Sequence, residues 1–255
     1  MMREETVFGP IYSRRLGASL GINLLPEKGK ICNFDCIYCE CGWNKDGRGD
    51  SVIPTAAQVR SRLEDKLAQL MLDGTHIDSI TFSGDGEPTL NPEFPRIIDD
   101  TLQLRDAYFP QATVSVLSNA TRVHVPEVLA ALRKVDNPIM KIDAPTNELI
   151  AKINKPAPGY DVARVIEGLQ GFEGNFILQT MFLRSDDFDS SSPAVLNGWM
   201  DIVRFLKPRG IMVYTIDRET PQAGLQSFSE AEMSALVQPL VNEGFRIRIN
   251  GKVQK

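Results

Sequence analysis

Strand-like and helix-like segments alternate along most of this 255-residue chain. The strand-like runs are rich in β-branched and aliphatic residues, and the runs between them carry apolar residues at helical spacing. This alternation is typical of repeated βα units around a parallel sheet, because a parallel connection needs a crossover that a helix supplies. The expected strands are 19–25, 77–82, 113–117, 139–142, 175–182 and 211–216, with a short closing strand at 245–249.

The helices expected between these strands begin at recognisable caps. The expected N-terminal pairs are Thr55 with Gln58, Asn91 with Pro92, Ser192 with Pro193, and Ser229 with Glu232. Pro239 lies inside the last helix and should kink or shorten it. We count six βα units, which predicts an α/β fold with a parallel sheet in a partial, open (β/α)6 barrel. The length suits a single core domain over residues 1–255, with a short N-terminal lead-in.

Three cysteines lie within eight residues directly after the first expected strand, at Cys32, Cys36 and Cys39. Three thiolates on one loop can hold three irons of a [4Fe-4S] cluster and leave the fourth iron without a protein ligand. An iron left open in this way can bind and reduce another molecule. The remaining cysteine, Cys41, is also close by, so the four are too local for a disulfide framework. The pattern favours a protein of a reducing compartment.

A zinc site is the alternative for these cysteines. Structural zinc sites usually combine two separated pairs of ligands, whereas Cys41 would have to close the tetrahedron only two residues beyond Cys39. We therefore expect Cys41 to be a bystander near the cluster, since free cysteines are commonly small apolar residues.

Chemistry-bearing residues follow the expected strands, where ligands of parallel α/β folds bind. Glu87 offers a carboxylate for an ammonium group, and the glycines before it let the backbone approach a ligand. Lys141 and Asp143 alternate along their strand and so point to one face, where they could also form a simple ion pair. The candidate ligand-binding residues are Tyr38, Gly84, Asp85, Gly86, Glu87, Ser118, Asn119, Lys141, Asp143 and Gln179.

The run C-x3-C-x-aromatic-C, with Tyr38 before the last cysteine, resembles the signature of the radical S-adenosylmethionine (radical SAM) superfamily. The resemblance implies one [4Fe-4S] cluster on Cys32, Cys36 and Cys39, with its open iron chelated by the amino and carboxylate groups of SAM. The segment 84–87 resembles the family's "GGE" motif, which holds the methionyl amino group. Ser118, Asn119, Lys141 and Asp143 resemble the family's contacts to the methionyl carboxylate and the ribose.

Longer strings resemble one subgroup, which contains the tRNA wyosine-base synthases and uncharacterised Fe-S oxidoreductases. They are Gly9-Pro10, Ser13 to Gly17, Ser19 to Asn23, Asp143-Ala144-Pro145 and Lys152-Ile153-Asn154-Lys155-Pro156. The wyosine synthases use additional cysteines for a second cluster. This chain has only Cys41 left, which argues against the same activity.

The resemblance implies that the reduced cluster cleaves SAM to a 5′-deoxyadenosyl radical, which abstracts hydrogen from an unidentified substrate. A one-electron reductant, flavodoxin- or ferredoxin-like, would feed the cluster. Three substrate classes remain open, namely a small metabolite, a tRNA base and a protein. The alternative is a non-enzymatic iron-sulfur or zinc-binding partner protein.

Charge bears on the substrate and on the setting. A net charge of −5 weakens the case for tRNA, since nucleic-acid binding depends on neutralising phosphates. Arg14 and Arg15 are candidates for a phosphate or carboxylate clamp, with a structural pair that ties the N-terminus to the barrel as the alternative. No stretch approaches the roughly 20 apolar residues that span a bilayer. We expect a cytoplasmic protein with no membrane partner. The basic clusters are Arg204, Lys207 and Arg209, and Arg246, Arg248, Lys252 and Lys255.

Overall fold

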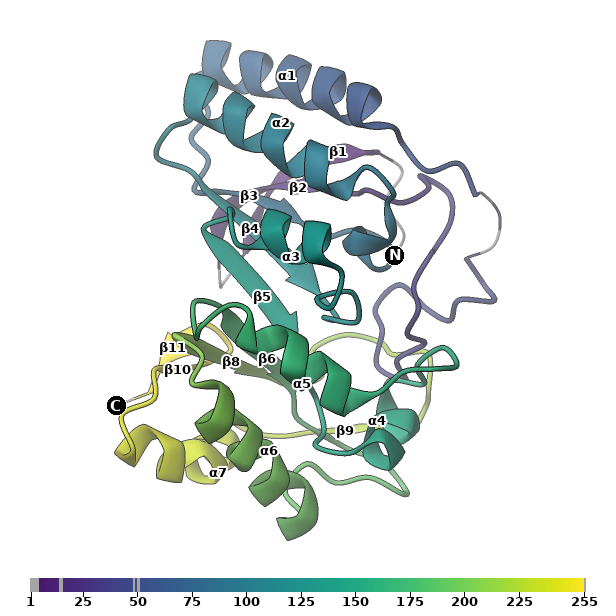
Figure 1. Ribbon diagram of the computed structural model, residues 1–255, viewed down its shortest axis with the longest axis vertical. Helices are drawn as coiled ribbons and strands as arrows, with labels where there is room; N and C mark the ends of the chain where they lie inside the picture. The colour runs from purple at the N-terminus through teal and green to yellow at the C-terminus, as the bar shows by residue number, and fades with distance from the viewer. Residues whose placement is uncertain (1–4, 14–15, 48, 50, 255) are drawn as a thin grey trace. The chain divides into compact units, whose positions relative to one another are not determined.

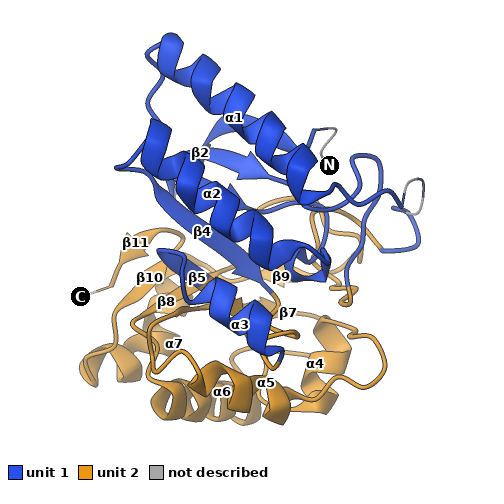
Figure 2. Ribbon diagram, turned by 45° about the horizontal axis from the view of Figure 1, so that its top comes forward, with its two compact units in different colours: residues 1–32, 44–118, 125–138 blue, residues 33–43, 119–124, 139–255 orange. Residues whose placement is uncertain are grey.

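The computed structural model describes residues 5–13, 16–47, 49 and 51–254, and it divides into two compact units (Figures 1 and 2). Unit 1 comprises residues 1–32, 44–118 and 125–138, and unit 2 comprises residues 33–43, 119–124 and 139–255. Each unit is therefore assembled from separate stretches of the chain. The single domain expected over residues 1–255 stays a prediction.

Unit 1 is a small α/β layer. β2 pairs with β3 and β3 with β4 in parallel, while β1 joins β2 antiparallel. The helices of this unit lie along its strands in Figure 2. The elements are β1 (Val7–Ser13), β2 (Gly17–Ile22), α1 (Ala56–Leu72), β3 (Ser79–Phe82), the 3-10 helix η1 (Pro88–Leu90), α2 (Phe94–Tyr108), β4 (Thr113–Ser118) and α3 (Pro126–Leu132).

Unit 2 also contains parallel strands with helices between them and an antiparallel strand at the edge. β5 pairs with β6, β6 with β8 and β8 with β10 in parallel, and β11 closes the set antiparallel to β10. The first two residues of β5 belong to unit 1. The elements are β5 (Asn137–Lys141), α4 (Asn147–Ile153), α5 (Val162–Gln170), β6 (Ile177–Met181), β7 (Leu183–Arg184), α6 (Pro193–Leu206), β8 (Gly210–Tyr214), β9 (Gln226–Ser227), α7 (Glu230–Asn242), β10 (Ile247–Ile249) and β11 (Lys252–Val253).

The expected parallel strands are all present, with ends shifted by a few residues. Both capping boxes are confirmed. The Thr55 and Ser229 hydroxyls each accept from the backbone N–H three residues on, and their own backbone N–H groups donate to the side chains of Gln58 and Glu232. The start expected at Asn91 is wrong, because α2 begins at Phe94 and its cap residue is Glu93. Asn91 instead donates to two distant backbone carbonyls from its amide.

Three further results bear on the sequence interpretation. Helix α7 continues past Pro239 and ends at Asn242. The strands β1, β7, β9 and β11 were not expected, and each is antiparallel to its partner. Among the residues that the structure describes, none of the helices combines the length and apolarity required to cross a bilayer. Arg14, Arg15 and Lys255 lie outside the described residues.

Candidate functional site

The predicted site residues fall into both units, so each set is described within its own unit. Unit 1 holds Cys32, the segment 84–87 and Ser118. Unit 2 holds the rest, which are Cys36, Tyr38, Cys39, Asn119, Lys141, Asp143 and Gln179.

Glu87 is a buried carboxylate with its side chain fixed by neighbours of unit 1. Its Oε1 accepts from the Thr89 backbone N–H at 3.1 Å, from the Thr89 hydroxyl at 2.6 Å and from the Ser118 hydroxyl at 2.8 Å. Only 2% of its surface is exposed. The structure thus brings Glu87 and Ser118 together, as the strand order predicts, and holds the carboxylate in one orientation.

The loop before Glu87 is tied to the residue preceding Cys32. The Ile31 N–H donates to Asp85 O at 3.1 Å, and the Glu87 N–H donates to Ile31 O at 3.1 Å. Gly86, at φ +138°, lies between these bonds, and a Cβ there would stand 1.9 Å from Ile31 O. Only glycine therefore fits at this position. The glycine acts here through a backbone pairing with the start of the cysteine loop.

Asn23 completes this loop and was not among the predicted site residues. Its Oδ1 accepts from the Leu25 N–H at 3.1 Å and from the Asp85 N–H at 3.2 Å. A Cβ on Gly84 would come within 2.0 Å of that same oxygen. The buried amide thus supports the turn through the Asp85 backbone.

The cysteine loop of unit 2 is held along its backbone by the segment that follows α4. The Asp35 N–H donates to Asn154 O and the Ile37 N–H to Ile153 O, both at 2.9 Å. The Ala157 N–H donates in turn to Asn33 O at 2.8 Å. Residues 153–157 therefore hold the backbone of the loop that carries Cys36 and Cys39.

Tyr38, Asp143 and Asn154 form a buried polar cluster next to Cys36. The Tyr38 hydroxyl donates to Asp143 Oδ2. Asn154 Nδ2 donates to the same Asp143 oxygen at 2.7 Å, to the Tyr38 oxygen at 2.8 Å and to Cys36 Sγ at 3.3 Å. The other Asp143 oxygen accepts from the Met181 N–H at 2.8 Å. This cluster joins the cysteine loop to the residues that follow β5.

Lys141 supplies the positive charge of this cluster. Its Nζ lies 3.4 Å from Asp143 Oδ1 and donates to the Tyr214 hydroxyl. The same ammonium stands 5.0 Å from the ring centroid of Tyr38 and 4.7 Å from that of Tyr214. A cation enclosed by a carboxylate and two aromatic faces is well compensated. Lys141 and Asp143 therefore do form an ion pair, and it is part of a larger arrangement.

Burial shapes the acidity of this cluster. Burial raises the pKa of the Cys36 thiol to about 11, partly opposed by the Lys141 charge and the Asn154 hydrogen bond. Burial, and then the Asp143 charge, hold the pKa of Tyr38 well above its usual range, so its hydroxyl stays a donor. For Lys141 burial acts to lower the pKa, but Asp143 and Tyr214 outweigh it and the pKa lies above its usual value.

The hydrogen bonds described for the Asp143 cluster do not include the side chains of Asn119 and Gln179. Asn119 Nδ2 donates to Asn33 Oδ1 at 2.7 Å, and its Oδ1 accepts from the Thr121 hydroxyl at 2.7 Å. It thereby contacts the residue next to Cys32. Gln179 lies in β6 opposite Lys141 in register, and it is buried. Its binding role stays a prediction.

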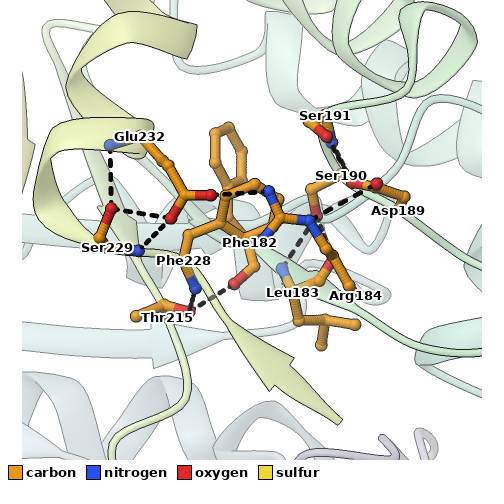
Figure 3. Close-up of polar contacts among 10 residues, drawn as sticks. All are labelled: Phe182, Leu183, Arg184, Asp189, Ser190, Ser191, Thr215, Phe228, Ser229 and Glu232. Atoms are coloured by element: carbon orange, nitrogen blue, oxygen red, sulfur yellow. Dashed lines mark hydrogen bonds and ion pairs between the residues drawn. The ribbon is translucent and has the colours of Figure 1, made fainter.

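The loops after β6 and β8 are fastened to each other at the end of the strands (Figure 3). Arg184 donates to Glu232 Oε1 at 2.9 Å, and its guanidinium carbon lies 3.6 Å from the Phe228 ring centroid. The Thr215 hydroxyl donates to Phe182 O at 2.8 Å and accepts from the Phe228 N–H at 2.9 Å. These contacts fix the start and end of the segment 215–228.

That segment reaches the cysteine loop within unit 2. The Gln222 N–H donates to Ile37 O at 3.2 Å, and Arg218 pairs with Glu40 at 2.6 Å. Glu40 directly follows Cys39. The cysteine loop is therefore contacted both by residues 153–157 and by the loop after β8.

The donor chemistry of the cysteines suits an iron-sulfur cluster. None of the four is in a disulfide, all are half-buried, and three of them fall within eight residues of one loop. In the described part of the chain, no three His, Cys, Asp or Glu side chains are grouped as a metal centre. Ligation by Cys32, Cys36 and Cys39 rests on their spacing and stays a prediction.

A family model described as "Radical SAM superfamily" matches residues 27–182, which include all three of these cysteines and Glu87, Lys141 and Asp143. The chain belongs to the radical SAM superfamily. The cofactors of that superfamily are a [4Fe-4S] cluster and SAM.

Curated relatives of the chain include two bacterial UPF0026 proteins. The one from Helicobacter pylori is 32% identical, covering 83% of this chain and 66% of its own length. The one from Synechocystis sp. is 30% identical, covering 84% of this chain and 77% of its own length. Across the curated relatives that it matches, the chain spans from 33% to 77% of their length.

Solved structures of radical SAM proteins share the fold. A radical SAM methyltransferase from Sphaerobacter thermophilus matches with a TM-score of 0.65 at 15% identity, over 94% of this chain and 67% of that one. Streptococcus suis SuiB bound to S-adenosylmethionine matches with a TM-score of 0.64 at 14% identity, over 87% of this chain and 48% of that one. The predicted α/β fold class is confirmed, and the pairing of its strands is mostly parallel.

Proposed function

We propose that this chain is an enzyme that binds one [4Fe-4S] cluster through Cys32, Cys36 and Cys39 and uses it to cleave SAM reductively. The observation that carries the proposal is the C-x3-C-x2-C triplet inside the segment that matches the superfamily model. When reduced, such a cluster supplies the electron that converts SAM to methionine and a 5′-deoxyadenosyl radical, which abstracts hydrogen from the substrate. All other tasks fall to side chains of the chain.

Glu87 is the proposed partner of the methionyl ammonium. Its carboxylate is held in one orientation by Thr89 and Ser118 before any ligand arrives. A carboxylate that is already oriented loses little conformational freedom when it accepts a charge-assisted hydrogen bond. Ser118 is thus proposed as a support of Glu87.

Lys141 is the proposed contact to the methionyl carboxylate. Its side chain is 12% exposed, whereas that of Asp143 is fully buried. Asp143 uses both oxygens on Lys141, Tyr38, Asn154 and the Met181 backbone. We assign Asp143 the task of orienting Lys141 and Tyr38. Gly84, Asp85, Gly86, Asn119 and Gln179 remain proposed SAM-binding positions.

The substrate class stays open between a small metabolite, a tRNA base and a protein, and charge does not favour tRNA. Two of the predicted basic residues are already paired in unit 2, since Arg204 meets Glu243 at 2.8 Å and Lys252 meets Glu230 at 2.9 Å. Pairing of this kind reduces the charge available to phosphates. A flavodoxin- or ferredoxin-like reductant is the proposed electron donor.

Metal analysis of protein reconstituted anaerobically tests the proposal. We expect about four iron and four sulfide ions per chain, as for one [4Fe-4S] cluster, and an electron paramagnetic resonance signal that changes when SAM is added. Zinc without sulfide would contradict the proposal. So would a cluster whose signal is indifferent to SAM.

A further inference from the structure

Asn154 lies at the centre of the cluster around Cys36, although no motif assigns it a role. It follows α4 as its C-terminal cap and is fully buried. It is 118 residues from Cys36 in sequence. Its side chain and its backbone carbonyl both contact the cysteine loop.

We propose that Asn154 is the positioning residue of the cysteine loop, and that its N–H group tunes the sulfur of Cys36. The inference rests on the proposed function, because the tuning acts on a cluster held by Cys36. The positioning itself is a property of the chain alone.

The hydrogen bonds show what the side chain does. Asn154 Nδ2 faces three acceptors, which are Cys36 Sγ, the Tyr38 oxygen and Asp143 Oδ2. The Asn154 NH2 group thus joins two residues of the loop to the Asp143 carboxylate. This fixes the positions of Cys36 and Tyr38. An amide is suited to this task, since its NH2 group has two donors and carries no charge that would repel Lys141.

The oxygen of the Asn154 amide is in an unusual environment for a buried polar atom. Asn154 Oδ1 is buried and has no hydrogen-bond partner among the described residues. Leaving a buried acceptor unpaired costs about 1–3 kcal/mol, so a stable core would favour an apolar side chain here. The amide is therefore retained for its NH2 group and for the groups that this donor contacts.

The backbone adds a second hold on the same loop. The Asp35 N–H donates to Asn154 O at 2.9 Å, and the Ile37 N–H donates to Ile153 O at 2.9 Å. The residues on both sides of Cys36 are thus bonded to the segment that presents the Asn154 side chain.

The tuning follows from charge. A reduced cluster carries one more negative charge than an oxidised cluster, so an N–H donor near a ligating sulfur stabilises the reduced form more. Removing the donor should make the cluster harder to reduce. We expect the ratio of reduced to oxidised cluster at a fixed potential to fall by roughly tenfold, which is about 59 mV for a one-electron couple.

The test compares Asn154→Ala and Asn154→Leu with Asn147→Ala. Leucine fills the volume without a donor, so it separates the lost hydrogen bonds from a cavity. Asn147 is an exposed asparagine at the start of α4 whose side chain also makes two hydrogen bonds, to Asp161 and the Val162 N–H. None of its hydrogen bonds reaches the cysteine loop.

Two measurements are made on the full chain. Hydrogen exchange of residues 33–40 without a cluster should be about tenfold faster in both Asn154 variants and unchanged in Asn147→Ala. Redox titration of the reconstituted cluster should show the tenfold shift in the same two variants only. Thermal unfolding and iron content confirm that the variants are folded and loaded.

Each outcome decides a distinct point. Unchanged exchange in Asn154→Leu overturns the positioning role. Faster exchange with an unchanged potential overturns the tuning and leaves Asn154 a structural residue. If the unaltered chain takes up no cluster, the proposed function fails, while the exchange result still decides the positioning role.

Discussion

Glu87 and Asp143 are two buried carboxylates that follow parallel strands, yet their surroundings differ. Glu87 Oε1 accepts from three neutral groups of the described residues, namely the Thr89 backbone and the Thr89 and Ser118 hydroxyls. Asp143 instead faces the Lys141 ammonium and also accepts from Tyr38 and Asn154. Two carboxylates at equivalent places after parallel strands can therefore have different roles. One that accepts from neutral groups keeps its charge for a ligand, whereas one paired with a buried cation stabilises the protein itself.

The largest expected effect is on the cluster. Replacing Cys32, Cys36 or Cys39 by alanine should abolish loading with about four iron ions, since a [4Fe-4S] cube with two protein ligands is poorly held. Cys41→Ala should load normally. Iron and sulfide analysis after anaerobic reconstitution measures both. Loss of the cluster in Cys41→Ala would mean a four-cysteine site with no place for SAM.

The next effect separates the two carboxylates by stability. Asp143→Asn leaves the Lys141 charge buried without its partner and should cost about 3–5 kcal/mol of unfolding free energy. Glu87→Gln keeps an acceptor for neutral donors and should cost no more than about 1.5 kcal/mol. Urea unfolding of the protein without a cluster gives both values. Equal losses of unfolding free energy in the two variants would contradict the distinction between the surroundings of Asp143 and those of Glu87.

The next effect concerns the affinity for SAM. Glu87→Gln removes the charge that meets the methionyl ammonium and should weaken SAM affinity by about 1.5–3 kcal/mol. Glu127→Gln, on the exposed face of α3, is the matched control and should bind SAM normally. Calorimetry on the reconstituted protein measures the affinities. An unaltered affinity in Glu87→Gln would remove Glu87 from the SAM site.

Ser118→Ala should have a smaller effect of the same kind. It deletes one of the hydroxyls that orient Glu87, so we expect about 0.5–1.5 kcal/mol of lost SAM affinity. The same calorimetry applies. A loss larger than that of Glu87→Gln would show that Ser118 contacts SAM directly instead of supporting the carboxylate.

The smallest expected effect concerns nucleic acid. We expect no tight, salt-sensitive tRNA binding, and reversing the exposed charges of Arg246 and Arg248 should therefore change little. If tRNA were the substrate, log affinity would fall with log salt by roughly 0.7–0.9 per neutralised phosphate. Gel-shift titrations over a range of salt check this. Sub-micromolar tRNA affinity at physiological salt would contradict the expectation.

The sequence predicted those parts of the fold that local rules decide. The capping boxes at Thr55 and Ser229 depend on residues three apart, and both form as expected. The helix start at Asn91 was wrong because its amide bonds to Leu24 O and Pro54 O, which are far away in sequence. Very short antiparallel strands such as β7 and β11 carry too few residues to show alternation.

The residues of the candidate site likewise divide into those that local patterns predict and those that only the folded chain brings together. The cysteine triplet and the residues after each strand can be found from spacing and from the position of ligands in parallel sheets. Asn154 and Asn23 could not be found in this way, because their roles depend on contacts formed only in the folded chain. Tyr214 was expected only as part of the strand 211–216, and the contact of its hydroxyl with Lys141 depends likewise on the folded chain.

The most direct test of the account is formation of 5′-deoxyadenosine from SAM by the reconstituted, chemically reduced protein. We predict that the unaltered chain and Cys41→Ala form 5′-deoxyadenosine and methionine in equal amounts, and that Cys36→Ala forms neither. Chromatography of the quenched reaction measures both products. An iron-loaded, reduced protein that binds SAM and leaves it intact would contradict the account.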